Sequence, residues 1–241
     1  MAKRFSLHPD TPQQRVIDQI RAELRSGGVI LYPTDTVYAI GCDLNVKAAV
    51  QRVRQIKQFS NDKPLTFICS SMSQASNYAY IHDSAYRLIR HLIPGPYTFL
   101  LPATKLVPKT VMNPQRKTAG IRVPDSPVCK ALIEALDNPI ISTSAHMPEP
   151  DPDLDLLDED EPETAAVLNA AESPPAEPID AASFFDRLEK QVDAIVSIEG
   201  RSPRVLGQDP EYHVSTIIDL TDDEPILLRK GLGWEAAADL I

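Results

Sequence analysis

The 241-residue chain is 43% hydrophobic and 24% charged, so it has enough apolar content to bury a substantial core. No apolar run approaches the roughly 20 residues that a membrane span needs. The opening residues, MAKRFSLHPD, contain no apolar stretch of the kind found in signal peptides. We therefore expect a soluble, cytoplasmic protein that does not associate with membranes.

The net charge of −10 is concentrated in one segment. Residues 146–182 contain twelve Asp or Glu, seven of the 22 prolines and no Lys or Arg, whereas the rest of the chain has 24 basic and 22 acidic residues. A segment of this composition buries too little apolar surface to fold alone. We predict a single domain over residues 1–241, with an acidic, proline-rich, disordered insertion at residues 147–182. The insertion is either a solvated spacer or a functional lid or nucleic-acid mimic.

Hydrophobic periodicity and turn residues divide the first part of the chain into helices and strands. Thr11 and Pro12 are typical of a helix start, and Gly27 of a helix end. The predicted elements are a helix between Thr11 and Gly27, strands at 29–32 and 37–40, a helix at 46–56, a strand at 64–69, a helix at 83–93 and a strand at 97–101.

The second part continues the alternation of strands and helices. We predict strands at 119–123, 139–142 and 193–198, helices at 126–136 and 184–192, and a C-terminal hairpin of strands at 214–220 and 226–229. Strands that alternate with helices, together with a hairpin, indicate an α/β domain with a mixed sheet.

Small hydroxyl residues and an isolated cation follow several predicted strands. Thr34, Asp35 and Thr36 separate the first two strands, and the run from Ser142 to Ala145 ends another. Arg122 lies between apolar neighbours, where a guanidinium needs an anionic partner. Ligands of open α/β sheets bind where strand ends gather. The polar triplet is therefore predicted to be both a turn and one wall of a ligand cavity.

Other kinds of site find less support in the sequence. The glycine patterns of P-loops and dinucleotide-binding folds are absent. Cys42, Cys69 and Cys129 lie far apart in apolar stretches, and the five histidines are scattered, so we predict buried free thiols and no protein-bound metal. The stretch from 103 to 122 carries basic residues without an acid and is a candidate anion-binding face: Lys105, Lys109, Arg116, Lys117 and Arg122.

An ordered set of motifs resembles the YrdC/YciO family, which includes threonylcarbamoyl-adenylate synthases. The motifs are GGVILYPTDTVYAIG, PGPYTFLL, GIRVP, STSA and STIIDLTDDEPILLRKG, and HPDTPQQR, KTAGIRVPDSP and RLEKQVDAIV look most like the YciO branch. The resemblance implies a YrdC-like twisted α/β sheet of mixed parallel and antiparallel strands around a concave basic cavity. It also implies a reaction of L-threonine, bicarbonate and ATP, with Mg²⁺ on the ATP, that yields threonylcarbamoyl-adenylate and pyrophosphate for tRNA modification.

The resemblance assigns roles to particular residues. It implies that Thr34 and Thr36 contact threonine and that Ser142 and Ser144 contact the substrate carboxylate, carbamate or phosphates. Catalytic roles go to Lys57 and Arg122, and nucleotide binding to Lys63, Ser215, Thr216 and Arg229. Catalysis would come from positioning and charge stabilisation, without a covalent nucleophile.

Two departures from the synthase pattern leave an alternative open. Phe59 stands where synthases usually carry an arginine, and His146 replaces the asparagine that follows STSA. An apolar ring does not stabilise developing negative charge, although Lys57 or Lys63 could compensate for it. The alternative is a protein without synthase activity that binds double-stranded RNA or tRNA through phosphates.

Overall fold

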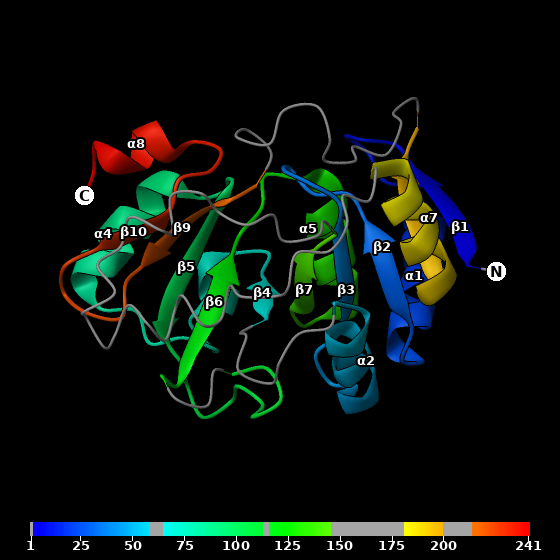
Figure 1. Ribbon diagram of the computed structural model, residues 1–241, viewed down its shortest axis with the longest axis horizontal. Coiled ribbons are helices and arrows are strands. Elements are labelled where there is room, and N and C mark those ends of the chain that lie inside the picture. The colour runs from blue at the N-terminus through cyan, green and yellow to red at the C-terminus, as the bar shows by residue number, and fades with distance from the viewer. Residues whose placement is uncertain (1, 58–64, 113–115, 146–180, 200–213) are drawn as a thin grey trace.

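A twisted ten-stranded sheet runs through the computed structural model, which describes residues 2–57, 65–112, 116–145, 181–199 and 214–241 (Figure 1). The strands are arranged in the order β1-β8-β2-β3-β7-β4-β6-β5-β9-β10. They are β1 (Lys3–Leu7), β2 (Val29–Tyr32), β3 (Ala39–Asp43), β4 (Thr66–Ile68), β5 (Tyr97–Pro102), β6 (Thr118–Arg122), β7 (Ile140–Ser144), β8 (Ala194–Ile198), β9 (Thr216–Asp219) and β10 (Ile226–Arg229).

Parallel and antiparallel pairs share this sheet. Strand β8 pairs in parallel with β1 and β2, and parallel pairs also join β4 to β6 and β5 to β9. The other five pairs are antiparallel, including the C-terminal hairpin of β9 and β10. The predicted mixed α/β fold and the hairpin are confirmed. Strands before and after residues 146–180 pair in the same sheet. Of the predicted insertion, residues 147–180 lie outside the described residues, and its last two residues begin the helix Ala181–Gln191.

Helices cover both faces of the sheet, because successive side chains of a strand point to opposite faces. On β2, Ile30 and Tyr32 join the core under α1 and α5, whereas Val29 and Leu31 join the core that includes residues of α2, α4 and α7. The helices are α1 (Gln14–Arg25), α2 (Lys47–Lys57), α3 (Met72–Ala75), α4 (Asp83–Leu92), α5 (Pro127–Leu136), α7 (Ala181–Gln191) and α8 (Trp234–Ala238).

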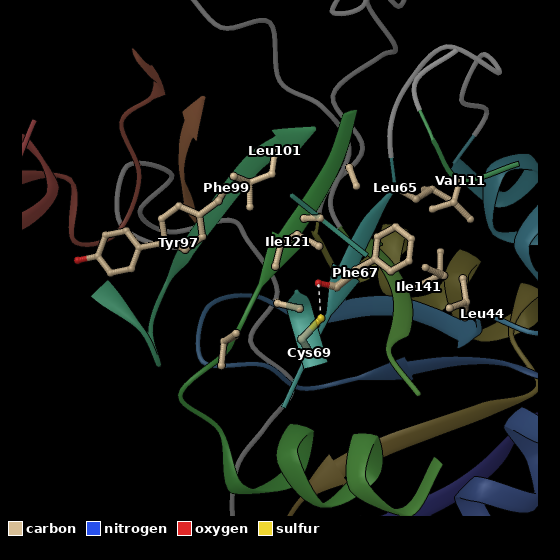
Figure 2. Packing of buried hydrophobic residues seen from close by; sticks show 14 of the residues in the cluster. Leu44, Leu65, Phe67, Cys69, Tyr97, Phe99, Leu101, Val111, Ile121 and Ile141 are labelled. Atoms are coloured by element: carbon tan, nitrogen blue, oxygen red, sulfur yellow. Dashed lines mark hydrogen bonds between the residues drawn. The ribbon is translucent and has the colours of Figure 1, made fainter. Parts of the chain in front are cut away.

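Aromatic and branched side chains of the central strands fill the core that includes residues of α2, α4 and α7 (Figure 2). Phe67 and Phe99 are almost fully buried, and Ile121 lies between their strands at the position opposite both. The ring of Phe67 stacks on Tyr78 with centroids 5.1 Å apart. Since full burial of a Phe or Ile side chain contributes roughly 1.5–3 kcal/mol, this core makes a firm support for the strand ends.

The structure corrects one predicted helix start and adds one strand. Helix α1 begins at Gln14, with Gln13 as its N-cap and without a side-chain cap, whereas the Thr11 hydroxyl lies 3.0 Å from Nδ1 of His8. The hydroxyl therefore has a partner outside the helix. Strand β1, which we did not predict, packs only Phe5 and Leu7 against the core, and this alternation is too short to mark a strand in the sequence.

Candidate functional site

The polar triplet lies beside Arg122 and beside the end of β7, but Arg122 and Ser144 lie at opposite ends of the strand register. The triplet connects β2 to β3, Arg122 ends β6 and Ser144 ends β7. Strands β3 and β7 pair with Ala39 opposite Ser144, which brings the end of β7 to the start of β3. Strand β4 is parallel to β6 and antiparallel to β7, so Ile68 lies opposite both Arg122 and Ile140, the first residue of β7. Arg122 reaches the triplet through side-chain hydrogen bonds to Asp35 and Thr36.

Arg122 is a buried cation whose hydrogen bonds leave one edge of the guanidinium unused. Its side chain is 9% exposed, and Nη2 donates to Asp35 Oδ1 at 2.7 Å and to Thr36 Oγ1 at 2.9 Å. Among the described residues, Nε of Arg122 is buried and has no hydrogen-bond partner. An unsatisfied buried donor costs about 1–3 kcal/mol, and such groups are rare enough in folded proteins to call for a specific explanation.

The Thr34 hydroxyl organises the turn between β2 and β3. It accepts a hydrogen bond from the backbone N–H of Thr36 at 3.1 Å and donates to the Val37 carbonyl at 2.7 Å. It also lies 3.1 Å from the Thr36 hydroxyl. Short polar side chains often stabilise turns by such local bonds. The turn is therefore held in place before a ligand arrives, beside Arg122.

The two candidate serines of β7 have different environments. Ser142 is 2% exposed, and its hydroxyl accepts from the Tyr32 hydroxyl at 2.8 Å and donates to the Ile40 carbonyl at 3.1 Å. Ser144 is two residues further along the same face and is only partly buried. Ser142 therefore supports the sheet through internal bonds, and Ser144 is the better placed of the two to contact a ligand.

Ser215, Thr216 and Arg229 form a second cluster at the C-terminal hairpin. Arg229 donates through Nε and Nη2 to the Ser215 carbonyl, at 3.0 and 2.7 Å. The buried Thr216 hydroxyl donates to the Leu232 carbonyl and accepts from the Gly231 N–H. These bonds fasten the C-terminal residues to β9 and β10.

Thr98 on β5 links the second cluster to the first. Its hydroxyl lies 2.9 Å from the Ser215 hydroxyl. On the other side, Phe99 pairs with Ile121 in antiparallel register, which puts Thr98 opposite Arg122. The cluster at the C-terminal hairpin is thus separated from Arg122 by one strand of the sheet.

One face of the central strands carries small or polar side chains, and we call it the polar face. Register aligns Ser142 with Thr66, Thr66 with Gly120 and Gly120 with Leu100. A Cβ atom added to Gly120 would lie 3.3 Å from Thr66 Oγ1. Within the described chain, the apolar cluster under α1 and α5 includes no residue of β5, β6 or β9. The polar face comprises Thr66, Thr98, Gly120, Arg122, Ser142 and Ser144.

The sequence prediction included Asp35 only as part of the polar triplet and did not assign Thr66, Thr98 or Gly120 to the site. A usable signal was present for Gly120, which precedes Arg122 by two residues and so shares its face of the strand. No such signal existed for Thr66 and Thr98, because their proximity to Arg122 depends on how distant strands pair.

Other predicted site residues lie at the margins of the described chain. Lys57 is the last residue of α2 and is partly exposed, whereas Lys63 lies outside the described residues, as do Phe59 and His146. The concave basic cavity stays a prediction. In the candidate anion-binding face, Lys105, Lys109 and Lys117 are exposed and Arg116 lies 3.7 Å from Asp219.

The three cysteines are buried free thiols, as predicted. Cys129 lies directly beneath the polar turn, where its thiol donates to the Pro33 carbonyl at 3.4 Å. Burial raises the pKa of Cys129 to about 12. The described parts of the chain contain no group of three or more His, Cys, Asp or Glu able to hold a metal ion. None of their helices is long and apolar enough to cross a membrane.

Comparisons with known proteins agree with this architecture. The YciO protein of Escherichia coli, which is uncharacterized, is 40% identical over 233 residues, and the match covers 97% of both chains. Its crystal structure superposes with a TM-score of 0.74. The structure of P. abyssi Sua5 complexed with L-threonine has a TM-score of 0.73 at 24% identity, over 99% of this chain and 60% of that one.

Named synthases match a shorter part of the chain. The threonylcarbamoyl-AMP synthase of Psychromonas ingrahamii is 35% identical over 127 residues, which is 52% of this chain and 66% of the synthase. Residues 22–156 match the protein family of Sua5, YciO and YrdC, described as telomere recombination. That range includes the polar turn, Arg122 and Ser144. The chain therefore belongs to the Sua5/YciO/YrdC family.

Proposed function

We propose that this protein is a nucleotide-binding enzyme of the threonylcarbamoyl-AMP synthase type. The observation that carries the proposal is the buried Arg122, whose Nε lacks a partner among the described residues, beside the turn that carries Thr34 and Thr36. A donor of this kind suits an anionic ligand. The partial similarity to a named threonylcarbamoyl-AMP synthase, and the threonine complex of a protein with the same fold, support this choice of substrate.

The proposed reaction needs two bond-forming steps. The amine of L-threonine attacks the carbon of bicarbonate to give a carbamate, and water leaves. A carbamate oxygen then attacks the α-phosphorus of ATP, the bond to the β-phosphate breaks, and pyrophosphate departs. Each step develops negative charge on oxygen, so fixed donors in a dry site accelerate it without a covalent nucleophile.

The arrangement of side chains suggests how the work is divided. Arg122 takes the carboxylate or carbamate, Thr34 and Thr36 hold the turn beside it, and Ser144 contacts the carbamate or α-phosphate. Ser142 acts through its bonds to Tyr32 and Ile40. The nucleotide extends along the polar face toward the Ser215, Thr216 and Arg229 cluster, and Mg²⁺ is carried by the ATP. Lys57 and Lys63 keep the catalytic and nucleotide-binding roles that the family resemblance implies.

Pyrophosphate release from ATP tests the proposal. Purified protein with ATP, Mg²⁺, L-threonine and bicarbonate is expected to form the threonylcarbamoyl adenylate and pyrophosphate only when threonine and bicarbonate are both present. Arg122→Lys keeps a cation beside Asp35 but lacks the second donor edge, so we expect the rate to fall about 100-fold. The matched control is Arg116→Lys, since Arg116 is exposed and pairs with Asp219, and it should stay within about twofold of the natural protein. Absence of product beside an active synthase would contradict the proposal.

Exposure of Lys105, Lys109 and Lys117 favours a second candidate function, binding of double-stranded RNA or tRNA through phosphates. Phosphate contacts release counterions, so affinity should fall steeply as salt rises. Filter binding of a short RNA duplex at two salt concentrations checks this. Affinity that is independent of salt, or unchanged when the three lysines are replaced by glutamine, would count against it.

A further inference from the structure

Asp35 joins three segments of the chain at the centre of the site. Its Oδ1 accepts a hydrogen bond from Arg122 Nη2 at 2.7 Å, and its Oδ2 accepts one from the backbone N–H of Asp125 at 3.0 Å. Asp125 precedes Ser126, the N-cap of α5. The carboxylate therefore holds the turn after β2, the end of β6 and the start of α5 in a fixed relation.

This contact decides which edge of Arg122 remains available. Both hydrogen bonds of the guanidinium leave from Nη2, one to Asp35 and one to Thr36. Two partners on the same nitrogen fix the rotation of the planar group. Of the donors that are left, Nε is buried and has no hydrogen-bond partner among the described residues, and it belongs to the strand that also carries Gly120 of the polar face.

The same contact changes the charge that a ligand meets. A lone buried guanidinium would attract a doubly charged phosphate more strongly than a singly charged carboxylate. Here the Asp35 carboxylate lies within hydrogen-bond distance of Arg122. The Asp35 side chain is only 10% exposed, so solvent screens its charge weakly. The pair has almost no net charge, so it gives a second negative charge on the ligand little of the attraction that a lone guanidinium would supply.

We propose that Asp35 is a positioning residue: it directs the unpartnered Nε–H of Arg122 toward the ligand and makes this subsite prefer a singly charged carboxylate or carbamate over a phosphate. The inference rests on the proposed function for the choice of threonine as ligand. It adds that the cancelled charges of Asp35 and Arg122, and not only hydrogen bonds, make the amino-acid end of the site prefer a different ligand group from the phosphate end.

Competition calorimetry with L-threonine and inorganic phosphate tests the inference. Asp35→Asn keeps the shape and one acceptor oxygen but removes the charge. We expect the ratio of the phosphate and threonine dissociation constants to shift at least about tenfold in favour of phosphate, with a steeper dependence on salt. Asp35→Glu keeps the charge on a longer stem, so both ligands should weaken together and the ratio should stay unchanged.

Asp43→Asn is the matched control. Asp43 is another buried aspartate that pairs with an arginine, Arg25, but it lies at the opposite end of β3. This variant should unfold at a lower urea concentration without a change in the ratio. Circular dichroism checks that each variant folds. If Asp35→Asn does not fold, Asp35→Glu alone tests whether Asp35 acts by directing the Arg122 side chain or by its negative charge.

The outcomes separate this inference from the proposed function. A ratio that moves less than about twofold in Asp35→Asn, or that moves equally in Asp43→Asn, contradicts the inference alone. Threonine binding without pyrophosphate release in the natural protein contradicts the proposed function alone. A natural protein that binds neither threonine nor phosphate contradicts both.

Discussion

At the scale of single residues, burial makes the cysteines unreactive although one of them borders the candidate site. Burial raises the pKa of Cys42 and of Cys129 to about 12, from an ordinary value of 9.0, and also raises the pKa of Cys69. The thiolate is the reactive form of cysteine. We expect the folded protein to resist iodoacetamide at about pH 8 and to react at all three positions in denaturant. Rapid alkylation of the folded protein, located by mass spectrometry, would contradict this.

The same pKa shifts predict how stability depends on pH. In the unfolded chain the thiols ionise near pH 9.0, whereas in the folded protein Cys42 and Cys129 stay protonated up to about pH 12. The stabilising contribution is therefore complete below about pH 9 and is lost as pH rises toward 12. Urea unfolding at several pH values should show a falling free energy of unfolding above pH 9. Replacement of Cys129 by alanine should make that decline shallower.

At the scale of elements, substitutions of two glycines in the sheet, Gly41 and Gly120, should affect stability and ligand binding differently. A Cβ atom on Gly41 in β3 would lie 2.7 Å from Ile140 Cγ2 and 2.8 Å from Tyr32 Cε1. Overpacking of this kind costs about 1–3 kcal/mol. A Cβ atom on Gly120 in β6 meets only Thr66 Oγ1 closely, at 3.3 Å, so it disturbs the core less.

We therefore expect Gly41→Ala to lower the free energy of unfolding by about 1–3 kcal/mol, measured with urea, while ligand affinity per folded molecule is retained. We expect Gly120→Ala to cost less stability and to weaken threonine or ATP binding, because its methyl group occupies the polar face. The reverse pattern, with weakened binding in Gly41→Ala only, would show that the polar face does not contact the ligand.

The elements that could be predicted from the sequence are those with a strong local signal. Helix α5 has its predicted start because Ser126 caps it and Pro127 opens it, and β2 is a fully buried VILY run. Strand β1 gave no such signal, since its sequence is largely exposed and its pairing with β8 spans most of the chain. Local propensity does not report pairing over that distance.

The candidate site shows the same division. Arg122 contacts the turn that carries Thr34 and Thr36, whereas Ser144 lies at the other end of the strand register. The contact between Asp35 and Arg122 joins positions 87 residues apart, and the side-chain spacing along either strand does not encode it. Nor does the sequence reveal that the Ser142 hydroxyl is occupied by Tyr32 and Ile40.

At the scale of the whole molecule, the sheet order makes the site a property of the complete fold. Strand β9, from the C-terminal part of the chain, pairs with β5, and β5 pairs with β6, which ends at Arg122 (Figure 1). The bond between Thr98 and Ser215 joins the two halves of the proposed site. Threonine and ATP would therefore bind side by side on one surface, and contact between the two ligands should make the binding of each favour the binding of the other.

Calorimetric titration of L-threonine, with and without a saturating concentration of ATP and Mg²⁺, tests the central claim most directly. We predict that the natural protein binds threonine more tightly when ATP is present and that Arg122→Lys loses this binding while it still folds. Equal threonine binding by the natural protein and by Arg122→Lys, or no binding of either ligand by the natural protein, would contradict a ligand site built around Arg122.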